Sequence, residues 1–410
     1  MKQELTQRLI KYVKINTRSN PYSDTIPSSE NQFDLANILL EECREMGLKD
    51  VSMDKHGIVM ATLPSNIDKK VATIGFIAHM DTADFNSENV SPRIIENYDG
   101  KDILLNEDLN IITDIETFPN LLKYKGDTLV VTDGLTLLGA DNKAGISNIL
   151  TAMNHLIQNP DIKHGDIKIA FTIDEEIGTG AESFDVEKFN ADFAFTVDGA
   201  GYGEMEYETF NAAASKVTFK GGSVHPGSAK DAMINANILV HEFISALPQY
   251  ERPEHTEKYE GFYLVTDSHA TIEDGSLELI IRDHDKTLFE AKKAYLDHIV
   301  KEMNQKYNQT VVTIETKDSY YNMEEILKDH MEIIDLAKKA IEKVGLTPIV
   351  EPVRGGTDGS RLSFMGLPTP NLFTGSDNFH GKHEFASIDA MQKSTETILE
   401  IIKLNTQMME

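Results

Sequence analysis

The stretch VATIGFIAHMDT, residues 71–82, joins an apolar run to a histidine and an aspartate that lie two positions apart. A short apolar run of this kind is typical of a buried strand. Alternate residues of a strand project to the same side, so His79 and Asp81 are expected to point together. Two such side chains at the end of a buried strand indicate a polar site beyond its carboxyl end.

Two further apolar runs, IKIAFTI (167–173) and ADFAFTV (191–197), have the same character, and a helix-like segment covers 144–157. This alternation predicts an α/β fold in which a mixed sheet carries helices on both faces. Helical periodicity also predicts helices over 1–15 and 31–46, the second with Ser29 and Gln32 as a capping box.

The rhythm changes between about residues 211 and 318, where the order of patterns is βαββαβ with helices over 230–247 and 286–307. This order predicts an inserted α+β domain of the split ferredoxin-like type. The α/β pattern then resumes with a helix over 322–344. We therefore expect a main domain in two parts, 1–209 and 321–410, interrupted by an inserted domain, 210–320.

Composition narrows the class of protein. The 410 residues carry 67 acidic and 39 basic side chains, a net charge of −28 that repels nucleic acid and anionic lipid surfaces. The single cysteine, Cys43, excludes an internal disulfide and favours a reducing compartment. The charged N-terminal segment lacks a secretory core, and no apolar run reaches the roughly 20 residues of a membrane span. These features predict a cytoplasmic protein.

Carboxylates follow the other apolar runs as well. Glu175 and Glu176 follow the second run, Asp198 follows the third, and Asp141 precedes the helix at 144–157. Taken singly, Asp141 could be a helix N-cap, the glutamate pair an acidic turn, Asp198 a turn residue and His79 a buried histidine. Together at adjacent strand ends, such carboxylates would repel one another unless a cation neutralised them, which indicates a metal cluster.

Histidine and carboxylate ligands suit zinc, with cobalt or manganese as substitutes. The segment NFHGKHEF (378–385) offers His380 as a further ligand, whereas His383 fits an outer or surface role better. The segments HEFIS (241–245) and HEFAS (383–387) begin like a zinc-protease helix motif, but each has serine where the second histidine is required. That mechanism is therefore rejected.

Seven motifs occur in order along nearly the whole chain: AHMDT, GADNKAG, TIDEEIG, TVDGAGYG, SVHPGSAKDAMINA, GGTDGSRLS and NFHGKHEF. In this order they resemble the co-catalytic zinc peptidases and deacylases related to aminoacylase, and within that family the tripeptide aminopeptidases most closely. One departure is GSDNFHG (375–381), where a second glycine is expected after Gly375. It affects only the expected shape of that loop.

The resemblance implies two zinc ions per subunit. It assigns His79 and Asp198 to one ion, Glu176 and His380 to the other, and Asp141 to both. Three ligand carboxylates and a bridging hydroxide would balance two divalent cations. The remaining roles that the resemblance implies are Glu175 as general base, Asp81 as the carboxylate that orients His79, and His225 as an oxyanion donor that reaches across a dimer.

Substrate recognition is expected to use an arginine, because a guanidinium binds a peptide carboxylate through two parallel hydrogen bonds. The candidates are Arg282, Arg354 and the neutral donor Asn235. Arg282 could equally pair with Asp283 or Asp285 in a surface network.

The leading hypothesis is therefore a cytoplasmic, homodimeric di-zinc aminopeptidase that hydrolyses small peptides, specifically tripeptides, in peptide catabolism. The dimer would form through the inserted domain, which also serves as a lid. The alternative keeps the chemistry and changes the substrate: a dipeptidase, a carboxypeptidase or an N-acyl amino acid deacylase. A non-catalytic metal-stabilised binding protein would require a missing base or ligand, and a serine hydrolase would require a G-x-S-x-G elbow.

Overall fold

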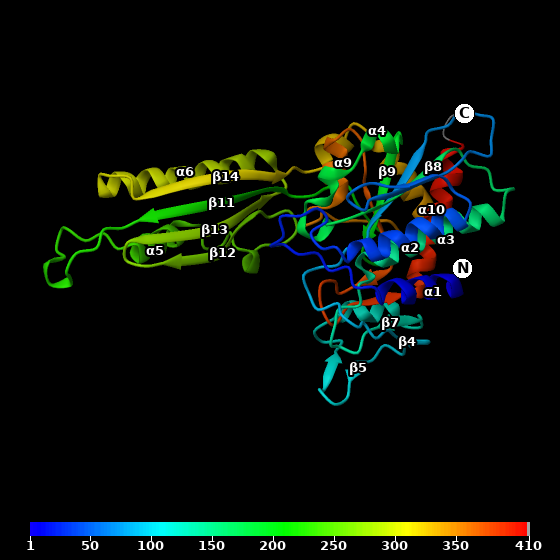
Figure 1. The fold of residues 1–410 in the computed structure, drawn as a ribbon, viewed down its shortest axis with the longest axis horizontal. Coiled ribbons are helices and arrows are strands. Elements are labelled where there is room, and N and C mark those ends of the chain that lie inside the picture. The colour runs from blue at the N-terminus through cyan, green and yellow to red at the C-terminus, as the bar shows by residue number, and fades with distance from the viewer. Residues whose placement is uncertain (408–410) are drawn as a thin grey trace. The chain divides into compact units, whose positions relative to one another are not determined.

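The computed structural model of the protein describes residues 1–407 (Figure 1). It divides into two compact units, a larger one built from residues 1–207, 325–351 and 357 onward, and a smaller one built from 208–324 and 352–356. Each unit has its own cluster of buried apolar side chains. Within residues 1–407, no helix combines the length and apolar character needed to cross a bilayer.

The larger unit is organised around a sheet whose strands run in the order β1-β2-β8-β3-β9-β16-β10-β15. Strands β8, β3, β9 and β16 are parallel neighbours, whereas β1, β2 and β10 contribute antiparallel pairs. The predicted mixed sheet is confirmed. Its strands are β1 (Lys49–Met53), β2 (Val59–Leu63), β3 (Ile74–His79), β8 (Ile167–Thr172), β9 (Phe193–Gly199), β10 (Glu204–Glu206), β15 (Ile349–Val350) and β16 (Asn371–Phe373).

Helices cover this sheet. Helix α3 packs on β3 and β9, α2 packs on β1 and β2, α9 packs on β9, and α10 packs on α3 and α8. Each brings an apolar stripe to the core, as an amphipathic helix must. The helices are α1 (Lys2–Val13), α2 (Gln32–Glu45), α3 (Ala140–Gln158), α4 (Val186–Phe189), α7 (Glu324–Leu327), α8 (Met331–Lys343), α9 (Asp358–Phe364) and α10 (Ile388–Asn405), with 3₁₀ turns η1 (Pro119–Tyr124), η2 (Glu175–Ile177) and η3 (Gly180–Ser183).

A second, smaller sheet in this unit has the order β17-β18-β7-β4, and all its pairs are antiparallel. This sheet places the segment before α3 next to the segment before α10, because β7 precedes α3 and β18 precedes α10. Its strands are β4 (Arg93–Ile95), β7 (Leu129–Val131), β17 (Ser376–Asp377) and β18 (Phe385–Ser387), and a separate hairpin joins β5 (Ile103–Asn106) to β6 (Ile111–Thr113).

The smaller unit is an antiparallel sheet of order β12-β13-β11-β14 with helices α5 and α6 (Figure 1). The βαββαβ prediction is confirmed. Its core includes the fully buried Phe219, Phe243 and Phe289. The elements are β11 (Asn211–Lys220), η4 (Pro226–Ser228), α5 (Ala236–Ala246), η5 (Pro253–His255), β12 (Phe262–Ala270), β13 (Asp274–Asp283), α6 (Lys286–Tyr307) and β14 (Val312–Tyr320).

Three helix predictions need correction. Helix α5 begins after residue 235, not at 230, because Gly222 and Ile234 exchange backbone hydrogen bonds and hold the preceding segment extended. The helix predicted over 322–344 is interrupted at His330, whose φ of −133° is not helical. The capping box is also wrong: Asn31 is the N-cap of α2. Nε2 of Gln32 does donate to Oγ of Ser29 at 3.3 Å, but its shorter bond, 2.6 Å, goes to Asp174.

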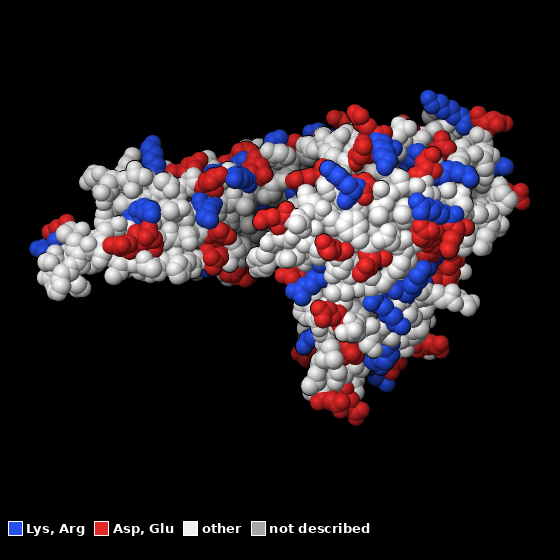
Figure 2. Space-filling view, in the orientation of Figure 1, with Lys and Arg blue, Asp and Glu red and all other residues white. Residues whose placement is uncertain are grey.

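Figure 2 shows acidic and basic side chains interspersed over the face in view, as is common for a highly charged protein surface.

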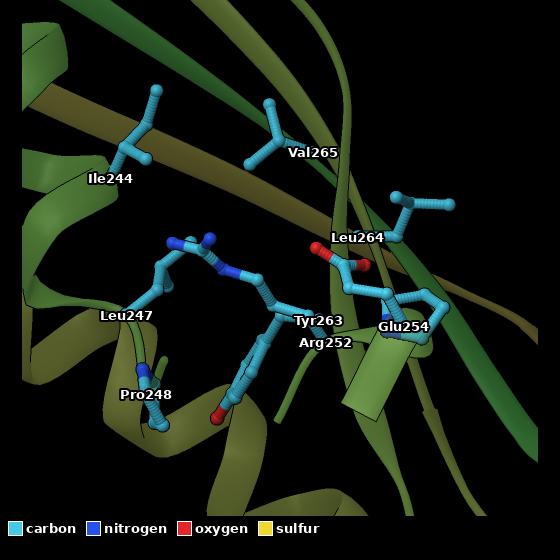
Figure 3. Close-up of a pocket in the computed structure, with 9 residues that line it drawn as sticks. Ile244, Leu247, Pro248, Arg252, Glu254, Tyr263, Leu264 and Val265 are labelled. Carbon is cyan, nitrogen blue, oxygen red and sulfur yellow. The ribbon is translucent and has the colours of Figure 1, made fainter. Parts of the chain in front are cut away.

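A pocket of about 220 Å³ lies in the smaller unit between α5 and β12, where the charged residues Arg252 and Glu254 line it together with Tyr263 (Figure 3). Its lining residues are Ile244, Leu247, Pro248, Arg252, Pro253, Glu254, Tyr263, Leu264 and Val265.

Candidate metal centre

The polar residues that follow the central strands come together at one edge of the sheet. His79 ends β3, Asp198 lies near the end of β9, and Glu175 and Glu176 form η2 just after β8. Strands β8, β3 and β9 are consecutive in the sheet, and Thr172 of β8 is paired in register with His79. Parallel strands therefore deliver their carboxyl ends to the same place, as the sequence pattern predicted.

Two histidines and three carboxylates form two groups that share one member. The Nε2 atom of His79 lies 2.9 Å from Oδ1 of Asp141 and 3.3 Å from Oδ1 of Asp198. The Nε2 atom of His380 lies 3.1 Å from Oδ2 of Asp141 and 2.9 Å from Oε2 of Glu176. Oδ1 of Asp141 therefore faces His79 of the first group, and Oδ2 faces His380 of the second.

The local backbone explains why Asp141 reaches both groups. Asp141 lies in the first turn of α3 but has non-helical dihedrals, φ −80° and ψ 104°. Its carboxylate does not cap the helix: Gly139 is the N-cap, and Oδ1 of Asn142 accepts the hydrogen bond from the Gly145 backbone N–H. The alternative interpretation of Asp141 as an N-cap is therefore wrong.

Asp81 connects the metal-facing histidine to the loop that carries the glutamates. Nδ1 of His79 lies 3.0 Å from the Asp81 carbonyl oxygen and 3.3 Å from its Oδ1. The two carboxylate oxygens of Asp81 accept hydrogen bonds from the backbone N–H groups of Glu175 and Glu176, at 3.0 and 3.2 Å. Asp81 is fully buried, so these bonds fix the ring of His79 and the start of η2 relative to each other.

Asp174 anchors the other side of the same loop, and the sequence analysis assigned it no role. It adopts the left-handed conformation, with φ 51°. Its carboxylate accepts hydrogen bonds from the Ser28 backbone at 2.7 Å, the Ser28 hydroxyl at 2.5 Å and Nε2 of Gln32 at 2.6 Å. The acidic run at 174–176 marked this position in the sequence, but the partners of Asp174 lie more than a hundred residues away along the chain.

The electrostatics of the cluster favour a cation. Burial, and then the charge of Asp198, raises the pKa of Glu175 well above its ordinary value. Burial, and then Asp141, raises the pKa of Glu176 to about 7. Hydrogen bonds to Asp141 and Glu176 raise the pKa of His380 to about 11. Glu175 and Glu176 are thus harder to ionise than free carboxyl groups, whereas hydrogen bonds to His380 and His79 lower the pKa of Asp141. A bound cation would favour the ionised form of all three carboxylates.

The residues fit a pair of divalent cations. Each of the two groups offers three ligand atoms within 4.8 Å of one another: His79 with Asp141 and Asp198, and Asp141 with Glu176 and His380. Oε1 of Glu176 is buried without a hydrogen-bond partner, although a buried carboxylate oxygen normally has one. Mixed imidazole and carboxylate donors are a ligand set that zinc accepts.

Two further buried carboxylates lie within motifs that the sequence analysis quoted without giving these residues a role. Asp358, in GGTDGSRLS, accepts a 2.7 Å hydrogen bond from the Thr172 hydroxyl, and burial raises the pKa of its carboxyl to about 7. Glu384, in NFHGKHEF, is 2% exposed and faces the backbone of residues 138–141. Its neighbour His383 contacts Thr113 and Phe118, away from the ligand atoms.

The other predicted residues lie in the smaller unit. Nδ1 of His225 accepts a hydrogen bond from Gly227 N–H, and the Asn235 side chain caps α5. Nη1 of Arg282 donates to the carbonyls of Ala213 and Ile281, while Asp283 and Asp285 accept hydrogen bonds from other groups. The Arg354 guanidinium donates to the carbonyls of Lys258 and Glu260 and to the Thr256 hydroxyl.

Both the sequence and the fold of the chain match known proteins. A Peptidase T of Fusobacterium nucleatum is 56% identical over 403 residues, 98% of each chain, and one of Geobacillus kaustophilus is 54% identical over 408 residues, 99% of each chain. The crystal structure of the aminopeptidase PepT from Bacillus cereus has the same fold, with a TM-score of 0.77 at 22% identity and 99% coverage of both chains. Residues 116–404 match the model of Peptidase family M20/M25/M40. The chain therefore belongs to Peptidase family M20/M25/M40, and its clustered histidines and carboxylates are compatible with a metal site.

Proposed function

We propose that this chain is a tripeptide aminopeptidase that uses two zinc ions to release the N-terminal residue from unblocked tripeptides. The observation that carries the proposal is the carboxylate of Asp141, which faces both groups of ligand atoms. The relatives named Peptidase T, which match nearly the whole chain at more than half identity, support the tripeptide substrate.

One zinc ion would be held by His79, Asp198 and Asp141, and the other by Glu176, His380 and Asp141. When bound, the cations would polarise the substrate carbonyl and lower the pKa of water in the site. Neither group of ligand atoms includes Glu175, so its carboxylate is available to take a proton from the attacking water and to return it to the leaving amine. Cobalt or manganese would serve as substitutes.

Asp81 and His225 would support the reaction without binding a metal ion. Asp81 would hold the His79 ring and, through two backbone N–H groups, the loop of Glu175. The proposed role of His225 is to donate a hydrogen bond to the oxyanion from the partner subunit of a dimer. Its exposed position in a turn leaves Nε2 free of the intramolecular bond that Nδ1 makes.

Among the substrate-binding candidates, Arg282 is favoured for the peptide carboxylate. Its described hydrogen bonds use Nη1 alone, whereas Arg354 uses both terminal nitrogens to hold the loop at 256–260. A guanidinium with unused N–H groups can still bind a carboxylate through two parallel bonds. Asn235, which caps α5, remains a proposed neutral donor.

We further propose that the protein is a cytoplasmic homodimer that associates through the smaller unit, which would also close over substrate as a lid. The buried and unpaired Cys43 is consistent with a reducing compartment. Light scattering of the purified protein would measure the dimer directly.

The substrate assignment is tested by hydrolysis of Ala-Ala-Ala with zinc restored, beside Ala-Ala, Ala-Ala-Ala-Ala and N-acetylated Ala-Ala-Ala. Release of N-terminal alanine from the unblocked tripeptide alone supports the proposal. Cleavage of the dipeptide, release of the C-terminal residue, or removal of the acetyl group would instead favour a dipeptidase, a carboxypeptidase or a deacylase.

A further inference from the structure

Glu384 joins the two chain segments that carry the shared ligand and His380. Its Oε2 atom accepts hydrogen bonds from the backbone N–H groups of Leu138 and Gly139, at 2.8 and 2.7 Å. Its Oε1 atom accepts one from the N–H of Asp141, at 2.8 Å. Three donors on one carboxylate occupy most of its acceptor capacity.

The fold explains why a side chain is needed at this point. Asp141 lies after β7, at the start of α3, and His380 lies on the connection between β17 and β18. Strands β7 and β18 pair with each other, but the pairing covers only residues 129–131 and 385–387. Beyond the paired residues, the two segments leave the sheet as loops, and the Glu384 carboxylate bridges them.

Burial makes these bonds strong and their loss costly. Glu384 is 2% exposed, and Leu138 is fully buried. A backbone N–H that loses its acceptor in such a place has no water to replace it, so the cost of removing that N–H from water is left uncompensated.

We propose that Glu384 is a positioning residue that fixes Asp141 relative to His380, so that the shared carboxylate reaches both groups of ligand atoms. This inference rests on the metal site of the proposed function, but not on the identity of the peptide substrate. Glu384 is not itself a ligand: its oxygens face backbone N–H groups, and neither group of candidate ligand atoms includes it.

The informative variant is Glu384→Gln, because the two oxygens have unequal partners. The amide oxygen can take the place of Oε2 and retain the bonds to Leu138 and Gly139. The amide nitrogen then faces the N–H of Asp141, donor against donor. The substitution thus disturbs the backbone of Asp141, the shared ligand, with almost no change in the volume of the side chain at position 384.

The test measures zinc binding to the metal-free full-length protein by competition with a chromophoric chelator, and the visible spectrum of the cobalt-loaded protein. We expect Glu384→Gln to weaken zinc binding about 10-fold to 100-fold, the usual effect of losing a group that orients a ligand, and to change the cobalt spectrum. The matched control is Glu206→Gln, which makes the same change at a half-buried glutamate whose carboxylate accepts a hydrogen bond from the side chain of Asn371. Wild-type zinc affinity and an unchanged cobalt spectrum in Glu384→Gln would overturn the inference, whatever the variant's melting temperature.

A second measurement needs no variant and covers the case in which Glu384→Gln fails to fold. Hydrogen exchange of the metal-free wild-type protein should show protected amides at Leu138, Gly139 and Asp141, because Glu384 holds them before any cation binds. Exchange as fast as in an unstructured loop would refute the inference. If the wild-type protein bound no zinc, the proposed function would fail while this measurement still decided the role of Glu384.

Discussion

Replacing Gly145 with alanine tests how closely helix α3 must approach strand β9. A Cβ atom at this position would lie 2.1 Å from the carbonyl oxygen of Val197 and 2.3 Å from Oδ1 of Asn142, and Cβ contacts below 3.0 Å are essentially never found. The helix or the strand must therefore move by about 0.9 Å, the difference between 3.0 and 2.1 Å. Both contacted residues are direct neighbours of candidate ligands, Asp198 and Asp141.

Two opposing terms set the expected loss of stability. Overpacking a core costs about 1–3 kcal/mol, and alanine in place of glycine returns up to about 1 kcal/mol of helix propensity. The net destabilisation of about 0–2 kcal/mol corresponds to a fall in melting temperature of up to about 3 °C, because the entropy of unfolding grows with chain length and reaches about 0.9 kcal/mol/K for 410 residues. A shift of roughly 1 Å between ligands can also cost about 10²-fold in kcat.

The assay combines thermal melting followed by circular dichroism with tripeptide hydrolysis under saturating zinc. Gly222→Ala is the matched control, because a Cβ atom there meets nothing within 4 Å, and it should leave both measurements close to wild type. If Gly145→Ala melted at the wild-type temperature and kept wild-type kcat, the close approach of α3 to β9 would not constrain the site, and the reasoning would be refuted.

Three other changes should have distinct effects. Glu175→Gln should lower kcat by about 10²–10⁴-fold while retaining both metals, the usual contribution of a general base; loss of zinc, measured by atomic absorption, would make Glu175 a ligand instead. Removing metal with a chelator should abolish activity and lower the melting temperature because the clustered carboxylates lose their counter-ions, and added zinc should reverse both effects; full activity in metal-free protein would contradict the metal centre. Burial lowers the pKa of His284 to about 4 from an ordinary value near 6.5, so the unfolded chain binds the proton first and the free energy of unfolding should fall as pH drops from 6.5 towards 4. His284→Asn should make stability, measured by thermal melting, depend less on pH between 6.5 and 4. An unchanged slope would show that His284 is not the group responsible.

The sequence predicted the strands that carry the site because each is a dense apolar run with polar residues at its end. The sequence did not predict the order of those strands in the sheet. The neighbours of β3 are β8 and β9, separated from it by many residues and by other elements. Only the assembled sheet brings Asp198 beside His79, and the same assembly brings Glu176 into the second group of ligand atoms. The expectation that carboxyl ends meet was a general property of parallel sheets, and it was sufficient here.

Hydrogen bonds between segments that lie far apart in the sequence escaped the sequence analysis. Gln32 was interpreted as part of a capping box because its neighbour Ser29 has the right spacing, but its amide binds Asp174, 142 residues away. Asp81 was expected to orient His79, and the structure adds that it also holds two backbone N–H groups of the glutamate loop. Such bonds depend on tertiary contact and leave no periodic pattern in the sequence.

The tripeptide His-Glu-Phe, which occurs twice, shows how completely context decides this. At 241–243 it lies within helix α5, where Phe243 enters the core of the smaller unit and Glu242 accepts hydrogen bonds from Lys306 and Tyr307. At 383–385 the same three residues leave a loop and enter strand β18, and the glutamate accepts hydrogen bonds from three backbone N–H groups beside the candidate metal ligands. The local sequence is identical, so neither the helix nor the role of the second glutamate can be encoded in it. What differs is the neighbouring structure: the pairing of β7 with β18 covers three residues, and the backbone N–H groups of residues 138, 139 and 141, further along the chain from β7, donate to the buried carboxylate of Glu384.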